Sequence, residues 1–201
     1  MVASIVLAAG QSRRMGKLKQ LLPLAGRTVI ETVVGRIFEA TTIDKNLLLV
    51  VVGHCSKKVE KCLHQQNISC VKNDRYREGM VTSVQCGIEA ITEKVDGYTI
   101  FLGDQPDVKP EIIDLVIRHA HKTKAGIIIP SYRGKRGHPL FISSKYRNEI
   151  LNLTADQGLN FVTRGHKEDT EEIAVESVEI LEDMDTPEDY TRISARFTSN
   201  S

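Results

Sequence analysis

The residues whose types and spacing suggest chemistry begin close to the start of the sequence. Residues 5–19 read IVLAAGQSRRMGKLK, so an apolar run leads directly into glycine, serine and several cations. Small residues let backbone N–H groups approach an anion closely, and arginine and lysine neutralise its charge. The segment therefore predicts a buried strand that ends in a loop around the phosphates of a nucleotide. A strand followed by a basic, solvated loop is the alternative interpretation.

The spacing of this loop differs from two widespread phosphate-binding motifs. A P-loop continues from Gly-Lys into Ser or Thr, whereas Gly16 and Lys17 are followed here by Leu18, so the magnesium-binding hydroxyl is missing. The loop also lacks the spacing G-x-G-x-x-G of dinucleotide-binding proteins. These differences argue against a P-loop enzyme and against a dinucleotide-binding oxidoreductase.

A second candidate is Asp104, which lies in the sequence FLGDQP at residues 101–106. An apolar strand ends here and delivers one carboxylate into a loop that Pro106 stiffens. Magnesium binds one or two protein carboxylates together with substrate oxygens and waters. In a phosphate site Asp104 is therefore the predicted metal ligand. The alternative role is that of an aspartate that caps a turn or a helix.

A third candidate segment, residues 73–84, reads NDRYREGMVTSV and passes through Gly79 into a predicted helix. Free N–H groups and the helix dipole favour an anion or a nucleotide sugar at such a helix start. Gly79 and Ser83 are therefore candidate nucleotide-binding residues. Ordinary capping of the helix by Thr82 or Ser83 is the alternative.

Apolar, β-branched runs alternate with segments of helical period along the chain. This alternation predicts an α/β fold, namely a doubly wound, mainly parallel sheet of Rossmann-like type with ligands at the carboxyl ends of its strands. The predicted strands, each buried on both faces, are residues 4–7, 47–52, 68–71, 98–102 and 127–129, and the predicted helices are residues 29–40, 57–66, 81–91 and 111–122.

The alternation of strand and helix patterns becomes irregular after Pro130. We interpret the residues that follow as a segment that leaves the sheet and covers the site. A chain of 201 residues suits one well-cored domain, which we place at residues 1–197, with a frayed tail at 198–201. Within the irregular part we expect a short helix near residues 146–153, a final strand near 175–181 and a helix that begins within 185–189.

Charge and cysteine content restrict the partners and the compartment. The 27 lysines and arginines nearly balance 26 aspartates and glutamates, so no global basic field predicts binding to nucleic acid or to an anionic membrane. The four cysteines form no C-x-x-C pair, no secretion signal is recognisable, and the longest apolar stretch, residues 47–52, is too short to span a bilayer. These features predict a cytoplasmic protein with reduced thiols.

Residues 7–19 resemble L-A-[AG]-G-x-S-x-R-M-G-x-x-K, the signature of the MobA-like NTP transferases that serve molybdenum cofactor synthesis. The Ala-Ala-Gly form and the following sequence QLLP look most like the cytidylyltransferase branch, which includes relatives in xanthine dehydrogenase maturation. The Asp104 segment resembles the family's magnesium motif L-[GA]-D-[MQ]-P, and Gly79–Val84 resembles G-M-x-x-S-[LV]. The resemblance implies a GT-A-like three-layer sandwich.

Later segments also resemble this branch. Residues 136–139 match its R-G-[HN]-P element, which implies that Gly137, His138 and Pro139 bind the acceptor. Residues 183–189 resemble [DN]-[IV]-[DN]-T-P-E-D, which offers Asp185 as a second metal ligand and Asp183 as its alternative. The sequence ADQGLN at residues 155–160 departs from G-D-x-G-A-R in its first glycine and its arginine, and this departure leaves the identity of the acceptor open.

The resemblance implies transfer of CMP from CTP to the phosphate of molybdopterin or molybdenum cofactor, with Mg²⁺ as cofactor, release of pyrophosphate and a molybdenum hydroxylase such as xanthine dehydrogenase as a further partner. The alternatives are a cytidylyltransferase for a sugar or isoprenoid phosphate and a maturation factor that binds the cofactor without turnover. Carried over residue by residue, catalysis falls to Arg14, Lys19 and Asp104, nucleotide binding to Leu7, Ala8, Ala9, Gly10, Ser12, Arg14, Lys19, Gly79 and Ser83, and the metal to Asp104 and Asp185.

Overall fold

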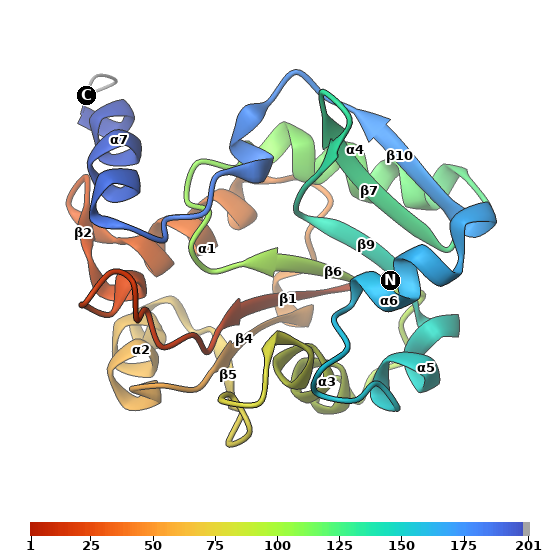
Figure 1. Cartoon of the computed structure of the whole chain (residues 1–201), viewed down its shortest axis with the longest axis horizontal. Helices are drawn as coiled ribbons and strands as arrows, with labels where there is room; N and C mark the ends of the chain where they lie inside the picture. Colours follow the sequence, from red (N-terminus) through yellow and green to blue (C-terminus); the bar gives the residue numbers. More distant parts are fainter. Residues whose placement is uncertain (199–201) are drawn as a thin grey trace.

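A central sheet runs through the molecule with helices on both of its faces (Figure 1). The structure, a computed structural model, describes residues 1–198. Its strands are β1 (Val2–Ala8), β2 (Pro23–Leu24), β3 (Arg27–Thr28), β4 (Leu48–Val52), β5 (Ser69–Lys72), β6 (Gly97–Leu102), β7 (Ile127–Tyr132), β8 (Lys135–Arg136), β9 (Leu140–Ser143) and β10 (Thr170–Ala174). Its α-helices are α1 (Val29–Glu39), α2 (Ser56–Leu63), α3 (Met80–Ala90), α4 (Pro110–Lys122), α5 (Arg147–Leu151), α6 (Asn160–Gly165) and α7 (Pro187–Thr198).

The strand order of the main sheet is β10-β7-β9-β6-β1-β4-β5, with β8 paired to β7. Strand β1 lies between β4 and β6 and is parallel to both, so that Ile5 stands opposite Leu49 on one side and Ile100 on the other. Strand β9 is antiparallel to β6 and β7, while β10 is parallel to β7. This mainly parallel sheet confirms the α/β fold class that the alternating pattern predicts.

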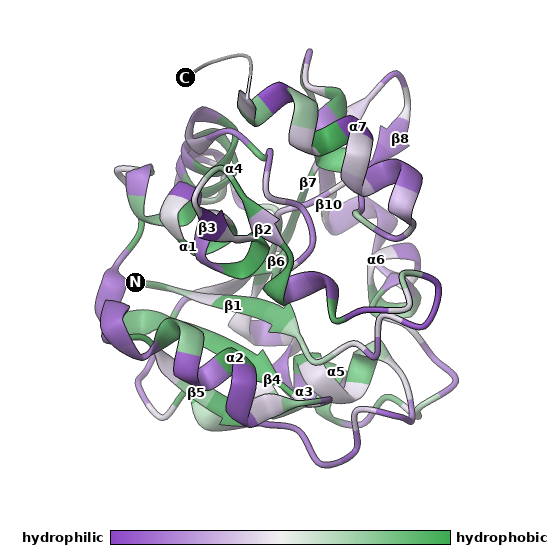
Figure 2. Ribbon diagram, turned by 90° about the vertical axis from the view of Figure 1, so that its left-hand side faces the viewer, coloured by the Kyte–Doolittle hydropathy of each residue, from purple (hydrophilic) through white to green (hydrophobic). Residues whose placement is uncertain are grey.

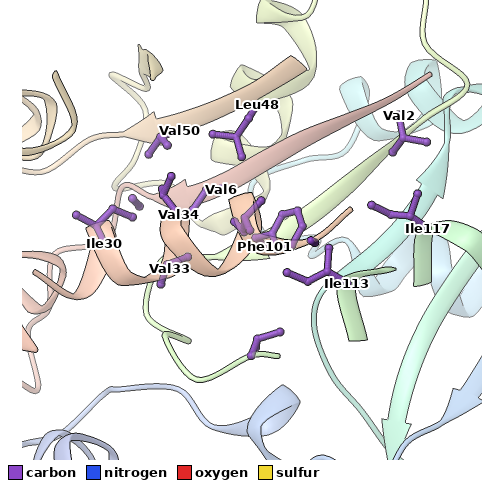
Figure 3. Packing of buried hydrophobic residues seen from close by; sticks show 14 of the residues in the cluster. Val2, Val6, Ile30, Val33, Val34, Leu48, Val50, Phe101, Ile113 and Ile117 are labelled. Atoms are coloured by element: carbon purple, nitrogen blue, oxygen red, sulfur yellow. The ribbon is translucent and has the colours of Figure 1, made fainter. Parts of the chain in front are cut away.

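The alternation of side chains along β1 divides the core into two layers. Val6 and Ala8 point to the face covered by α1, α2 and α4, whereas Ala3 and Ile5 point to the face covered by α3, α5 and α6. Figure 3 shows part of the first layer, where residues of β1, β4, β6, α1 and α4 gather, and Figure 2 shows β1 and β4 as largely hydrophobic. The three layers of a sandwich follow from this division.

Local sequence explains where two of the helices begin. Thr28 and Glu31 form a capping box at the start of α1, because the Glu31 amide donates to Thr28 Oγ1 and the Glu31 carboxylate accepts the Thr28 amide. Pro110 occupies the first turn of α4, where the absence of its N–H costs no hydrogen bond.

A small apolar cluster joins the loop after β1 to the C-terminal part of the chain. Met15 packs with Leu24, Val29, Met184 and Ile193. The hydroxyl of Tyr190 on α7 also donates to the Pro23 carbonyl of β2 at 2.6 Å, which agrees with the neighbouring positions of α7 and β2 in Figure 1. These contacts hold the loops of residues 10–19 and 183–186 against one another.

Two expectations about strands were wrong. No strand covers residues 175–181 in the part of the chain that the structure describes: the last strand is β10, and residues 178–181 form a 3₁₀ helix. Strand β10 lies at the edge of the sheet and exposes Glu171 and Glu172, so it lacks the apolar pattern by which buried strands are recognised. Strand β5 is the opposite edge and is partly exposed, whereas burial on both faces was expected.

The expected tail at residues 198–201 falls almost entirely outside the described residues, which end at Thr198 in α7. Of the helices found in residues 1–198, none is long and apolar enough to cross a membrane.

Candidate active site

A cleft of about 520 Å³ opens at the carboxyl ends of β1 and β6 and at the start of α3. Most of the residues expected to bind nucleotide or metal line it, namely Leu7, Ala9, Gly10, Ser12, Arg14, Lys19, Gly79, Ser83, Asp104 and Asp185. Ala8 is the exception, because its side chain is fully buried in the core beneath the cleft. Because β1 alternates its side chains between the two layers, the Ala8 side chain points into the core, and the predicted role of Ala8 in nucleotide binding stays a prediction.

Ser12 organises the loop that follows β1. Its backbone is left-handed, with φ of 52°, and its carbonyl oxygen accepts the amides of Met15 and Gly16. Its Oγ accepts the Lys19 amide at 3.0 Å and donates to Gln20 Oε1 at 3.3 Å. These bonds close the loop and hold the backbone of Lys19 beside the cleft.

The Lys19 ammonium joins two aspartates that come from distant parts of the chain. Its Nζ donates to a carboxylate oxygen of Asp104, just after β6, and at 2.8 Å to Asp185 Oδ1, just before α7. Arg14 Nη2 donates to the other oxygen of Asp185 at 2.6 Å. Burial by itself lowers the pKa of Lys19, but the charges and hydrogen bonds of the two aspartates outweigh it and raise the pKa above the ordinary value.

Asp183 lies in the same cleft but has a different partner. Its Oδ1 accepts Gln105 Nε2 at 2.8 Å, and the structure records no ion pair between Asp183 and Lys19 in residues 1–198. Burial raises the pKa of Asp183, and the negative charge of Asp104 adds to this shift. Asp185 rather than Asp183 therefore faces the cations of the site.

The helix start at α3 is held by a buried asparagine. Asn73 Nδ2 donates to Thr82 Oγ1 and to Ser83 Oγ, both at 2.9 Å. Gly79, just before α3, has φ of 136°, and a Cβ there would lie 2.9 Å from the Ala155 carbonyl oxygen. This position therefore requires glycine, both for its backbone and for the close approach.

A second cavity, of about 430 Å³, adjoins the first, because Leu7 and Met80 line both. Gly137 and His138 line this second cavity, whereas Pro139 lies beside a much smaller void that also touches His138 and Gln105. Burial lowers the pKa of His138 to about 4, so its imidazole is neutral at neutral pH. The walls of the second cavity are mostly apolar.

A comparison of the sequence with protein families identifies the family to which the chain belongs. Residues 4–171 match the MobA-like NTP transferase domain. The chain belongs to this family. The resemblance to the MobA-like NTP transferases that was drawn from the sequence motifs is thus confirmed.

Two relatives of the chain are named for molybdenum cofactor. The chain is 28% identical over 197 residues to the molybdenum cofactor cytidylyltransferase of Escherichia coli (strain K12), with 96% of each chain covered. It is 35% identical over 140 residues to a probable molybdenum cofactor guanylyltransferase of Natranaerobius thermophilus, covering 70% of this chain and 64% of that protein. The sequence relatives therefore include proteins named for each of two nucleotides.

Among solved structures, the manganese complex of Rv0371c from Mycobacterium tuberculosis H37Rv superposes with a TM-score of 0.79 at 25% identity, covering 96% of this chain and 98% of that one. That structure is a complex with manganese.

The residues of this MobA-like chain fit a divalent metal on their own chemistry. Asp104 and Asp185 approach closely enough to share one ammonium group, and both face the polar cleft. Within residues 1–198, no three His, Cys, Asp or Glu side chains form a metal site by themselves. Two carboxylates suit Mg²⁺, which completes its shell with waters and substrate phosphate oxygens.

Sequence reasoning missed several residues of the site. Gln20 and Tyr76 line the cleft, and Asn73 and Gln105 hold its walls in place through buried hydrogen bonds. Asn73, Tyr76 and Gln105 stand inside the motifs quoted above. Their position inside these motifs was the available signal, but the sequence does not show that Gln105 pairs with Asp183 across 78 positions.

Proposed function

We propose that this chain is a nucleotidyltransferase that moves CMP from CTP to the phosphate of molybdopterin or molybdenum cofactor in the cytosol. The observation that carries the proposal is the contact between two cavities at Leu7 and Met80. One cavity contains cations and carboxylates suited to a triphosphate and a metal. The other is mostly apolar and suits a flat heterocycle whose phosphate reaches into the first.

The proposed reaction needs no general base. A phosphate oxygen of the acceptor forms a bond to the α-phosphorus of CTP, while the bond from this phosphorus to the oxygen bridging the α- and β-phosphates breaks. Pyrophosphate leaves with the electron pair of that bond. The attacking oxygen is already anionic at neutral pH, so no side chain has to remove a proton. The protein accelerates the reaction by positioning its substrates and neutralising charge.

Each charged residue has a role in this scheme. Lys19 and Arg14 bind triphosphate oxygens, and Ser12 fixes the backbone from which Lys19 extends. Asp104 and Asp185 hold Mg²⁺ at the same end of the cleft. When bound, Mg²⁺ neutralises negative charge on the phosphate oxygens and makes the phosphorus more electrophilic.

The acceptor lies against the second cavity. Gly137 packs so closely on Ile180 that a Cβ would lie 2.5 Å from the Ile180 carbonyl oxygen, and the His138 amide donates to this same oxygen at 3.0 Å. The loop is thereby held against the residues that precede Asp183 and Asp185. His138, neutral at physiological pH, contacts the acceptor as a hydrogen-bonding group and not as a cation.

The test is release of pyrophosphate by the purified protein with Mg²⁺, CTP and molybdopterin. We expect stoichiometric pyrophosphate and a cytidine dinucleotide of the pterin. Release with a sugar or isoprenoid phosphate but not with the pterin would favour the alternative acceptor. Binding of both substrates without release would favour a maturation factor. The names of the relatives described above mention no oxidoreductase that receives the product. The proposal therefore includes the dinucleotide product but no molybdenum hydroxylase as a partner.

A thermal-shift series with CTP, GTP, ATP and UTP, each with Mg²⁺, gives an independent test of the nucleotide. Preferential binding to the folded state raises its stability, so we expect the largest increase in Tm with CTP.

A further inference from the structure

The proposed function assigns Arg14 and Lys19 to the triphosphate and Asp104 and Asp185 to the metal. In this structure the two cations form ion pairs with these two aspartates. Lys19 Nζ contacts both Asp104 and Asp185, and Arg14 contacts Asp185 alone. The ammonium thus stands between the two carboxylates, where the proposed function places the metal.

The Lys19 contacts are better shielded from solvent than the Arg14 contact. The side chains of Lys19 and Asp104 are 10% and 16% exposed, whereas the Arg14 side chain is 71% exposed. Ion pairs in such shielded positions are screened less by water and salt than those on the surface. Lys19 is therefore the main internal counter-ion of the two aspartates.

This pairing opposes the binding of either ligand alone. A divalent metal that arrives without nucleotide meets carboxylates whose charge is already neutralised, and it is repelled by the ammonium between them. A triphosphate that arrives without metal has to draw Lys19 away and leave the two aspartates unpaired beside its own negative charge. When both arrive together, the carboxylates exchange a side-chain cation for the metal ion. The side-chain cations exchange a carboxylate for the phosphates, so no charge is left unpaired.

We propose that Lys19 is an exchangeable counter-cation that occupies the metal position of the free protein until a triphosphate draws it away. Metal and nucleotide then bind with positive coupling. The inference rests on the proposed function, since it concerns the regulation of the same site.

The chemistry of lysine suits this exchange. Its ammonium is a compact charge with three donors on a flexible four-carbon chain, so it can leave the carboxylates without a fixed planar geometry being lost. The Ser12 Oγ bond to the Lys19 amide keeps the backbone in place. The side chain can therefore move between carboxylate and phosphate while the loop remains folded.

The test is a titration of the nucleotide-free protein with Mn²⁺ alone, in which the concentration of free Mn²⁺ is measured by electron paramagnetic resonance. Removing a positive charge this close to both carboxylates strengthens cation binding, so we expect Lys19→Met to bind Mn²⁺ about tenfold more tightly than wild type. Lys19→Arg retains the charge and stays near wild type. Lys17→Met removes an exposed lysine of the same loop and serves as the matched control. Unchanged or weaker Mn²⁺ binding by folded Lys19→Met would overturn the proposal.

A second variant keeps the test decisive if Lys19→Met fails to fold. Arg14→Gln removes an exposed side chain that contacts Asp185 only, and we expect it to tighten Mn²⁺ binding about threefold. If Arg14→Gln binds Mn²⁺ no more tightly than the wild type does, the proposal is contradicted. Coupling supplies a further measurement: the factor by which CTP raises Mn²⁺ affinity should be smaller in folded Lys19→Met than in wild type.

Neither titration requires an acceptor. Failure to release pyrophosphate with any acceptor would therefore remove the proposed function while leaving the Mn²⁺ results to judge the role of Lys19.

Discussion

Met184 donates its backbone N–H to the carbonyl oxygen of Asp104 at 3.0 Å. Its side chain is fully buried, and it packs in the same cluster as Met15 of the loop after β1. One residue therefore ties the end of β6, the loop of residues 10–19 and the start of α7 together. Asp185 follows Met184 directly, so this bond and this packing bring its carboxylate beside that of Asp104.

Met184→Ala is expected to destabilise the protein by about 2 to 5 kcal/mol, because it removes a buried side chain and leaves a cavity in a small cluster. Urea unfolding measures this loss. Leu115→Ala, at a site that is 38% exposed on α4, is the control and should cost much less. An equal effect of the two substitutions would show that the cluster does not hold the loops together.

The proposed metal ligands are tested by Asp104→Asn and Asp185→Asn. Asp104→Asn should nearly abolish turnover, because it removes a carboxylate that faces both the metal and the triphosphate. Asp185→Asn should raise the Mg²⁺ concentration needed for half-maximal rate, since one of two protein carboxylates is lost. Rates measured across a Mg²⁺ series distinguish these effects.

Asp183→Asn and Glu188→Gln complete this set. Asp183 contacts Gln105 and not a cation, so its substitution should change the Mg²⁺ requirement less than Asp185→Asn does. Glu188 is exposed in the first turn of α7 and should tolerate the change. A larger Mg²⁺ effect at Asp183 than at Asp185 would exchange the roles of the two aspartates.

Lys19→Ala is expected to weaken CTP binding by about 2 kcal/mol or more, because it removes a charge-assisted contact in a partly buried site. Arg14→Ala should cost less, since the side chain is exposed and its interactions are screened by water. Equilibrium dialysis with labelled CTP measures both, and thermal unfolding confirms that the variants fold. Wild-type affinity in both would refute their assignment to the triphosphate.

The preference for CTP over GTP is tested at Ala9. This residue lines the cleft, and its Cβ would lie 2.8 Å from a Cβ at Gly53, so the wall behind it is tightly packed. If the base of the nucleotide lies against Ala9, its methyl group leaves less room for a purine, so Ala9→Gly should reduce the proposed preference for CTP. Competition binding of the two nucleotides decides the matter, and tighter binding of GTP by the wild type would refute the prediction.

The lowered pKa of His138 predicts a specific acid sensitivity. Its pKa is about 4 in the folded chain against an ordinary 6.5, so the unfolded chain binds more protons between these values. Stability is therefore retained above pH 6.5 and falls as the pH drops toward 4, by at most about 1.4 kcal/mol per pH unit from this group.

Urea unfolding at pH 7, 6 and 5 measures this dependence. His138→Gln should flatten it, whereas His64→Gln, at an exposed position directly after α2, is the control. An unchanged slope in His138→Gln would mean that other groups cause the acid sensitivity.

Patterns within short segments were enough to predict much of this protein. The apolar runs of β1, β4 and β6 are central strands whose neighbours bury both faces, so their composition reveals them. The loops after β1 and β6 carry motifs whose glycine, cations and aspartate are contiguous in sequence. The fold class and most of the residues that line the cleft could thus be predicted, because in parallel sheets ligands gather where strands end.

The edge strand β10 could not be predicted in this way. Strand β10 buries little of its surface, and its exposed glutamates interrupt the apolar pattern. The more apolar residues 178–181 form a 3₁₀ helix in which only Ile180 is buried. Ala8 lies in the same motif as the other residues predicted to bind nucleotide. Only the alternation of β1 within the folded sheet turns its side chain into the core.

The sequence alone determined which residues are able to bind phosphate and metal, since their charges and donors belong to the side chains themselves. Tertiary structure decided which of them meet. Lys19, Asp104 and Asp185 converge because Met184 is bonded to the end of β6 and packed against Met15. Asp183 turns instead to Gln105. These contacts join segments far apart along the chain, and no local pattern contains them, because they depend on how the packed sheet brings separate loops to one edge.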